Sequence, residues 1–444
     1  MIYLIVILLI FQILMGVWHI QYSLIIVLLF GFLIPPLYSI PLGPLNLNSF
    51  NCSIFIFCTE ACFYKNKSKR DSTLKMTLLI WSIVMCSMSF FASIGWRPFS
   101  VYIKDMILYM LEFFAMGICL LMVPFSRKDL RVFSIASIAI GIIVTLYAIL
   151  NYIIGINPYM MMINFETGNI DMTAYYMNEA RGVLSRRASS TFILPLALGQ
   201  FMCLLQFYLC YVYRKKKIAV LIIYVLFLIP IVLSGSRSCI FPALLLPLIY
   251  FLMCSTKVKL YVGIAFLVIF PFLFMALPDR HKDTLIATIC IWDEKKSDKV
   301  DINGSSVSMR LDQINSAFRI VEESPLFGKG IGYVKEKGDE HKDEMLGYEG
   351  FLLQSLIESG IFGTFIFLFF YILLCVNIVK KVNYNKESMF VVAYSIMYLI
   401  SILLTGIVYS TFSYFLLFYV LILKGLKLKL EYKGNCYYFQ PLIR

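Results

Sequence analysis

The sequence predicts an all-α, polytopic integral membrane protein with 12 or 13 transmembrane helices. Of its 444 residues, 60% are hydrophobic and only 15% are charged, whereas about a quarter of a soluble domain is charged. Apolar runs of about 20 residues, long enough to cross the hydrocarbon layer as a helix, recur along the whole chain. A transmembrane barrel would show ten-residue alternating segments instead, so these continuous runs predict helices.

Short clusters of Lys and Arg separate the apolar runs, as expected of cytoplasmic loops. They stand at residues 65–70, 127–131, 214–217, 257–259 and 380–386, and again from Lys424. We therefore interpret the net charge of +13 as positive-inside bias rather than as a nucleic-acid surface. With the clusters as boundaries, spanning segments are expected at 2–17, 21–38, 47–63, 76–93, 106–124, 132–154, 191–213, 218–234, 239–254, 260–277, 350–379, 388–408 and 411–424.

The N-terminal segments leave two points open. Residues 1–16 have no basic region before the apolar run and no small-residue cleavage site, so we expect a first anchor rather than a cleaved signal peptide. Four prolines between residues 35 and 44 interrupt the next runs. The side of the N-terminus and the choice between 12 and 13 helices therefore stay open.

Two long polar stretches, 155–190 and 278–349, fall on the outer side by this alternation. The second, between the tenth and eleventh segments, holds 15 of the 26 acidic and 11 of the 39 basic residues, a balance typical of a soluble segment. An apolar rhythm from Leu311 to Val321, ending before Pro325, predicts a helix there. We expect this loop to cap a single domain that comprises residues 1–444.

Motifs of soluble enzymes are absent. The chain has no phosphate loop, no H-E-x-x-H pair and only three histidines, so neither a metal site nor a cofactor is predicted. The 12 cysteines lie mostly within apolar runs and predict neither a disulfide framework nor a zinc site.

Two polar motifs on the outer side carry arginines. The first, Ser234-Gly235-Ser236-Arg237-Ser238, joins two apolar runs; its arginine is either an interface residue of a helical hairpin or a bidentate ligand for a diphosphate. The second places Arg310 and Arg319 on a short amphipathic helix and continues into residues 324–332. The glycines there allow a sharp turn or a close approach to a ligand, while Arg319 also fits a solvated helix face.

A third motif lies at the outer mouth of a spanning segment. Tyr348 and Glu349 come directly before it, and a carboxylate at a helix N-terminus is stabilised by the helix dipole whether or not it reacts. We expect Glu358, more than one turn further along, to make a structural hydrogen bond inside the bundle.

Taken in order, these motifs resemble the O-antigen ligase and Wzy-type polysaccharide polymerase superfamily. The likeness covers roughly residues 187–363, beginning with Arg187-Ala188-Ser189-Ser190-Thr191-Phe192. It implies that Arg237 and Arg310 contact the diphosphate of a lipid-linked donor. Ligases of this family carry a His-Asn pair nine residues before the acid that corresponds to Glu358. Here Glu349 and Gly350 stand at that point, which favours a carboxylate base and a polymerase.

The resemblance implies a glycosyltransferase of the bacterial inner membrane that joins polyprenyl-diphosphate-linked repeats without a metal or cofactor. Glu349 would be the base, and the donor and acceptor glycans, the bilayer, and chain-length regulator and flippase proteins are the expected partners. Two alternatives remain: a ligase that transfers glycan to another acceptor, and a transporter of lipid-linked sugar. Further candidate substrate-binding residues are Arg181, Arg186, Arg187, Arg319 and Tyr348.

Overall fold

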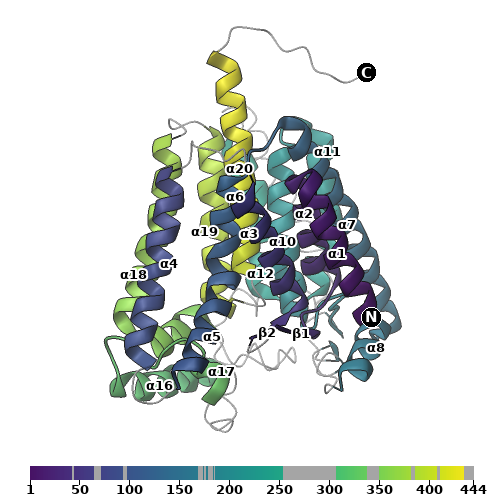
Figure 1. The fold of residues 1–444 in the computed structure, drawn as a ribbon. Helices are drawn as coiled ribbons and strands as arrows, with labels where there is room; N and C mark the ends of the chain where they lie inside the picture. The colour runs from purple at the N-terminus through teal and green to yellow at the C-terminus, as the bar shows by residue number, and fades with distance from the viewer. Residues whose placement is uncertain are drawn as a thin grey trace, which may run out of the picture.

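The structure is a computed structural model that describes residues 1–42, 45–64, 72–93, 98–168, 174, 177–178, 184, 186–253, 307–337, 350–381, 386–407 and 411–434. Within these ranges most helices run along one common axis (Figure 1). Five helices are long and apolar enough to cross a membrane, and seven shorter apolar helices accompany them. The all-α polytopic fold class is therefore confirmed. The expected segment 260–277 lies outside the described residues.

The first half of the chain packs consecutive helices against one another. Its elements are α1 (Ile2–Trp18), α2 (Ile20–Leu33), β1 (Ser39–Leu42), β2 (Leu45–Asn48), α3 (Ser49–Phe63), α4 (Ser72–Ser93), α5 (Phe99–Met110), the π-helix η1 (Leu111–Ala115), α6 (Met116–Met122), α7 (Arg127–Ile154) and α8 (Pro158–Thr167). The second half comprises α10 (Pro195–Val212), α11 (Lys217–Leu233), α12 (Arg237–Met253), α16 (Val307–Glu323), α17 (Tyr333–Lys337), α18 (Phe351–Lys381), α19 (Lys386–Thr405) and α20 (Thr411–Gly434).

A two-stranded hairpin replaces helix between α2 and α3. In the antiparallel pair β1–β2, Ser39 lies opposite Asn48 and Leu42 opposite Leu45. Proline has no backbone N–H and disrupts a helix interior, which explains why the proline-rich residues before α3 are not helical. The side chain of Asn48 then accepts a hydrogen bond from the Asn51 N–H at 2.7 Å and caps α3.

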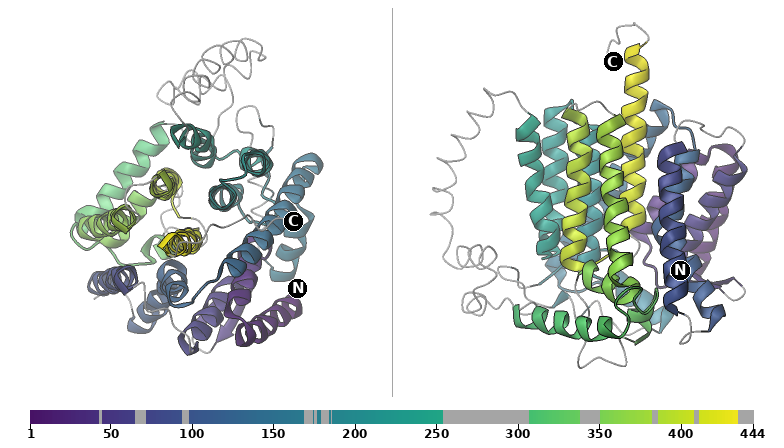
Figure 2. Two further views of the ribbon diagram at one scale, coloured as in Figure 1. Left: turned by 90° about the horizontal axis from the view of Figure 1, so that it is seen from above. Right: turned by 90° about the vertical axis from the view of Figure 1, so that its left-hand side faces the viewer.

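The most deeply buried helices are α10 and α20. In α10, 89% of residues are buried, and the side chains of α20 are buried from Thr411 to Leu423. Seen along the bundle axis, α20 (yellow) lies in the interior, with other helices around it (Figure 2). Aromatic rings fill this interior; those of Tyr398 and Phe415 stack 4.6 Å apart. Large apolar side chains on the outer faces of α1, α7 and α11 are exposed, as expected for a bundle surrounded by lipid.

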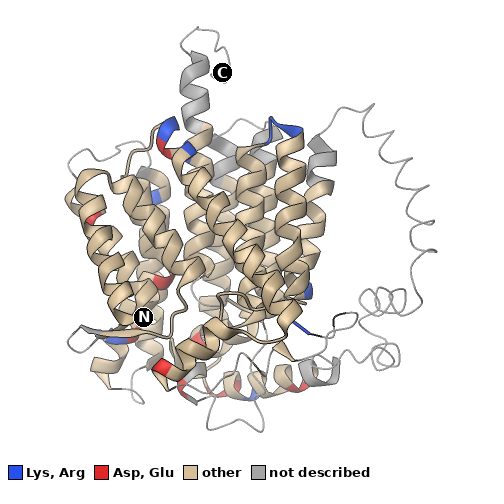
Figure 3. Cartoon of the chain, turned by 90° about the vertical axis from the view of Figure 1, so that its right-hand side faces the viewer, with Lys and Arg blue, Asp and Glu red and all other residues tan. Residues whose placement is uncertain are grey.

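The two ends of the bundle differ in charge. Most described Asp and Glu lie near the end that carries α16, whereas the basic starts of α7 and α11 lie at the opposite end (Figure 3). Positive-inside bias predicts that the α16 end faces outward. The Met1 ammonium group lies 3.6 Å from the Glu166 carboxylate of α8, so α1 also begins at this predicted outer end.

Candidate active site

The serine–arginine turn, residues 234–238, connects α11 to α12. Gly235 has φ of 65°, a conformation that glycine adopts without a steric penalty. The Ser234 hydroxyl donates to the Ile231 carbonyl at 2.6 Å and accepts from the Ser236 N–H at 3.2 Å. Helix α12 then begins at Arg237, which is half-buried and lies at the positive end of the helix dipole.

A second arginine is docked on this turn from the segment before α10. Arg187 is buried, and its Nε donates to the Ser234 carbonyl at 2.8 Å. The Ala188 N–H also donates to the Leu233 carbonyl at 2.8 Å. These bonds orient the guanidinium without cancelling its formal charge. The structure therefore brings Arg187 and Arg237, predicted from distant segments, together at the predicted outer end of the bundle. We call this pair of arginines and the turn that holds them the arginine corner.

Hydrogen bonds tie this corner to the outer ends of α19 and α20. The Ser238 and Thr405 hydroxyls are 3.1 Å apart. Gln200 of α10 donates to the Gly406 carbonyl at 2.9 Å and accepts from the Thr411 hydroxyl at 3.1 Å. Hydrogen-bonded polar groups thus lie against the arginine corner, and this network favours a fixed geometry of the turn.

The glycine loop, residues 324–332, is bonded to a break in α18. The helix is interrupted at Gly360, where φ is 65° and ψ is −170°. The N–H groups of Lys329 and Gly330 donate to the carbonyls of Ile357 and Glu358, each at 2.8 Å. In return, the Ile361 N–H donates to the Pro325 carbonyl at 3.0 Å and the Phe362 N–H to the Leu326 carbonyl at 3.2 Å.

The contact between the glycine loop and the break in α18 explains why Gly328 and Gly360 are glycines. A Cβ atom on Gly328 would stand 2.5 Å from the Gly360 nitrogen, and one on Gly360 would stand 2.4 Å from the Leu326 carbonyl oxygen. At Gly328, the close approach that the sequence predicts is therefore to another backbone segment. Glu358 makes its hydrogen bonds at a different place from the bundle interior that the sequence predicts. The residue precedes the helix break, and its Oε1 accepts from the N–H groups of Gly332, at 3.0 Å, and Val334, at 3.3 Å.

The structure does not gather all the predicted arginines in one place. The exposed Arg186 lies against Gly155 at the end of α7, and Arg319 is exposed on α16. Arg310 belongs to the first turn of α16. Arg181, Tyr348 and Glu349 lie outside the described residues.

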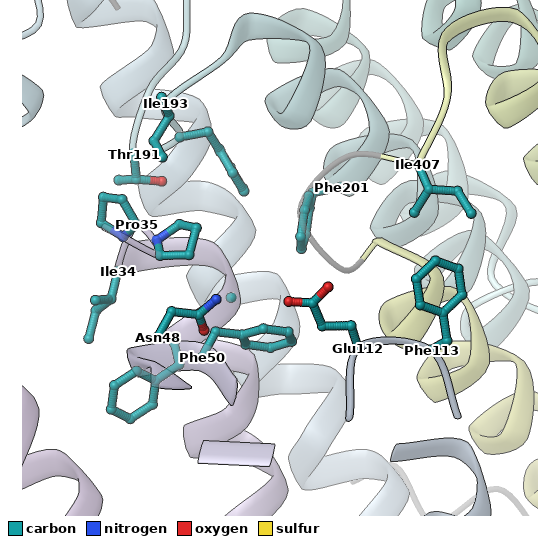
Figure 4. A pocket seen from close by; sticks show the side chains of 14 residues that line it. Ile34, Pro35, Asn48, Phe50, Glu112, Phe113, Thr191, Ile193, Phe201 and Ile407 are labelled. Atoms are coloured by element: carbon teal, nitrogen blue, oxygen red, sulfur yellow. The ribbon is translucent and has the colours of Figure 1, made fainter. Parts of the chain in front are cut away.

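One charged residue at the outer half of the bundle escaped the sequence analysis. Glu112 lies in η1 and lines a cavity of about 330 Å³. Its carboxylate points into the space between Phe50 and Phe201 (Figure 4). The signal was available, because a carboxylate within a predicted spanning segment is by default a functional-site hypothesis. Within the described ranges, no group of three His, Cys, Asp or Glu is placed to hold a metal ion.

The serine–arginine turn, both arginines of α16, the glycine loop and Glu358 all fall within one matched segment. Residues 219–368 match the O-antigen ligase family. The resemblance predicted from the sequence is thereby confirmed over this segment, which comprises 150 of the 444 residues. Arg187 and Glu112 lie outside the matched segment. No curated protein matches the chain.

Proposed function

We propose that the protein is a polymerase that joins polyprenyl-diphosphate-linked oligosaccharide repeats into a surface polysaccharide at the outer face of the bacterial inner membrane. The supporting observation is the arginine corner. Its Arg237 lies within the segment that matches the O-antigen ligase family, and its Arg187 lies before that segment. Arg187 and Arg237 are held at the N-terminus of α12, at the predicted outer end. A helix N-terminus and guanidinium groups together favour a diphosphate.

The proposed reaction is a glycosyl transfer without a metal ion or cofactor. The acceptor hydroxyl oxygen bonds to the anomeric carbon of the donor, and the bond from that carbon to the diphosphate oxygen breaks. The acceptor proton passes to Glu349, and the diphosphate leaves with the electron pair, stabilised by Arg237 and Arg310. A Cβ atom on Gly350, which follows Glu349 in the sequence, would stand 3.0 Å from the Leu403 carbonyl oxygen near the end of α19.

A Glu349→Gln variant tests the base. The amide keeps the size of the side chain but cannot take the proton, so the rate should fall about 10²–10⁴-fold. Losing only a favourable interaction with the helix dipole would cost about 0.3–1 kcal/mol of stability. Rates should be measured with purified protein and lipid-linked repeat and normalised to folded enzyme. Glu322→Gln, at an exposed carboxylate of α16, is the control; a Glu349→Gln rate within about threefold of native would remove Glu349 as the base.

The ligase is the second candidate, because the matched family is described by that name. Glycan ladders from cells with and without the gene separate the two reactions. Loss of long chains with one repeat retained indicates a polymerase, while accumulation of free lipid-linked polymer indicates a ligase. A transporter predicts that unpolymerised repeats stay on the inner leaflet, so that outer-face labelling of the repeat is lost with the gene.

A further inference from the structure

The cavity beside Glu112 is separate from the arginine corner, but some of its lining residues are close in sequence to residues that form that corner. Its wall includes Thr191, four residues after Arg187, and Ile407, which follows the Gly406 carbonyl that Gln200 binds. The remaining wall comes from the end of α2, the loop to β1, the end of β2, the start of α3, Phe113 of η1, the two residues after Thr191, and Phe201 of α10. A ligand in this cavity would therefore lie beside the elements that hold the two arginines.

The π-helix η1 contributes to the cavity wall. Its Glu112 and Phe113 line the cavity, while Leu111 and Phe114 on either side are buried in the core. Ser413 of α20 donates to the carbonyls of Leu111 and Glu112, so the backbone groups at the bulge are paired. Single π-bulges within α-helices occur frequently at functional sites.

The lining has the chemistry of a sugar site. The Glu112 carboxylate accepts from the Asn51 side-chain amide at 2.9 Å, and an ionised carboxylate offers about four acceptor positions. Asn48 and Thr191 add polar groups, while Phe50 and Phe201 present ring surfaces (Figure 4). A carboxyl group in the wall disfavours a purely apolar lipid chain, which would desolvate it without offering a hydrogen bond. The volume falls at the lower end of the roughly 300–1,000 Å³ range of small-molecule sites.

We propose that this cavity binds a sugar ring of the acceptor glycan and that the Glu112 carboxylate accepts hydrogen bonds from its hydroxyl groups. The proposal rests on the proposed function, because it needs an acceptor whose hydroxyl is brought to the arginine corner. It assigns Glu112 to acceptor binding and leaves proton transfer to Glu349.

Binding without turnover tests this subsite. The probe is the oligosaccharide released by mild acid from the native lipid-linked repeats, titrated into the full-length protein in lipid nanodiscs. Glu112→Gln should weaken binding at least about tenfold, the usual effect of losing a charged hydrogen bond, yet its amide oxygen can still accept from Asn51. Glu60→Gln is the matched control, since that carboxylate lies in α3 against Gly16 and not in the cavity wall; it should bind as the native protein does.

Three results would overturn the subsite: no binding by the native protein, binding by Glu112→Gln within about twofold of native, or equal weakening by Glu60→Gln. If Glu112→Gln does not fold, Ile407→Trp replaces it, because the larger side chain fills the cavity and should abolish binding; unchanged binding would overturn the subsite as well. Failure of the proposed polymerase is detected separately, by normal ladders in cells that lack the gene. Binding lost in Glu112→Gln together with normal ladders would keep the sugar site and reject the polymerase.

Discussion

The serine–arginine turn and the glycine loop both belong to the segment that matches the O-antigen ligase family, but they work in different ways. In residues 234–238, the backbone folds so that Arg237 and the start of α12 stand at the outer corner where Arg187 docks. In residues 324–332, by contrast, the backbone N–H and carbonyl groups are bonded to the break in α18. One motif presents charge, and the other joins two segments of chain.

The difference teaches that two motifs of the same matched segment can have different roles: one positions charged groups, and the other stabilises the fold. Losing charge at the turn should reduce the rate and leave the fold intact, whereas adding atoms at Gly328 or Gly360 should reduce stability, with activity following the amount of folded protein. The following variants test this separation.

The largest effect is expected from Arg237→Ala. Removing a cation that stabilises the leaving diphosphate should lower the rate about 10²–10³-fold with normal amounts of protein in the membrane. Arg→Lys should restore activity only in part, because the bidentate fork is lost. Arg127→Ala is the control, since that exposed arginine lies at the start of α7, at the opposite end of the bundle; in vitro rates within about twofold of each other for the two alanine variants would reject a special role for Arg237.

Gly360→Ala should destabilise the fold by more than about 3 kcal/mol. Its backbone conformation is essentially restricted to glycine and costs about 1–3 kcal/mol for other residues, and the added Cβ would meet Leu326 and Gly328 backbone atoms within 2.6 Å. Gly168→Ala is the milder reference, because Gly168 has positive φ (68°) in the left-handed helical region (ψ 16°) and its Cβ would have no neighbour within 4 Å. Equal unfolding temperatures of the two variants would show that the loop can move aside.

Glu358 provides an intermediate test. Glu358→Ala leaves the Gly332 and Val334 N–H groups without this acceptor, at a cost of about 1–3 kcal/mol. Glu358→Gln keeps an acceptor oxygen and should lose less stability. Thermal unfolding and specific activity should be measured on both. A Gln variant of native stability whose rate falls a hundredfold would make Glu358 part of the reaction, contrary to the structural role assigned here.

The smallest effect is expected from Lys329→Met. Lys329 makes an ion pair with the exposed Glu323 and lowers the pKa of that carboxyl. A pKa lowered by folding contributes stability above the unfolded value, near 4.3, and loses it as the pH falls through the folded value. Native and variant proteins should therefore differ slightly in unfolding temperature at pH 7 and converge at acidic pH, once the Glu323 carboxyl is protonated in the folded state. A difference that persists after this protonation would assign the effect to packing.

The sequence predicts the membrane class and most spanning segments because hydropathy and basic clusters act locally. It also includes among its candidates both arginines, Arg187 and Arg237, that the structure places at the serine–arginine turn. It does not predict the π-helix at Glu112 or the break at Gly360, because each depends on partners far along the chain. The prolines before α3 indicate an interruption, but the strand pairing that they adopt is not predicted either. Ser413 supports the π-helix across about 300 residues, and residues 325–330 pair with the break at Gly360. Local patterns carry no information about such partners.

The bonds at Gly360 also set how α18 meets the lipid bilayer. Beyond the break, residues 361–379 form the apolar part of α18, which ends with Lys380 and Lys381, and 19 residues at 1.5 Å each span about 28 Å. A free helix slides or tilts to match a thicker or thinner hydrocarbon layer. This one is held at its outer end by the backbone of the glycine loop, so the lipids around it must adapt. Reconstitution into bilayers of graded acyl-chain length should therefore give a maximum in stability at a thickness near that span.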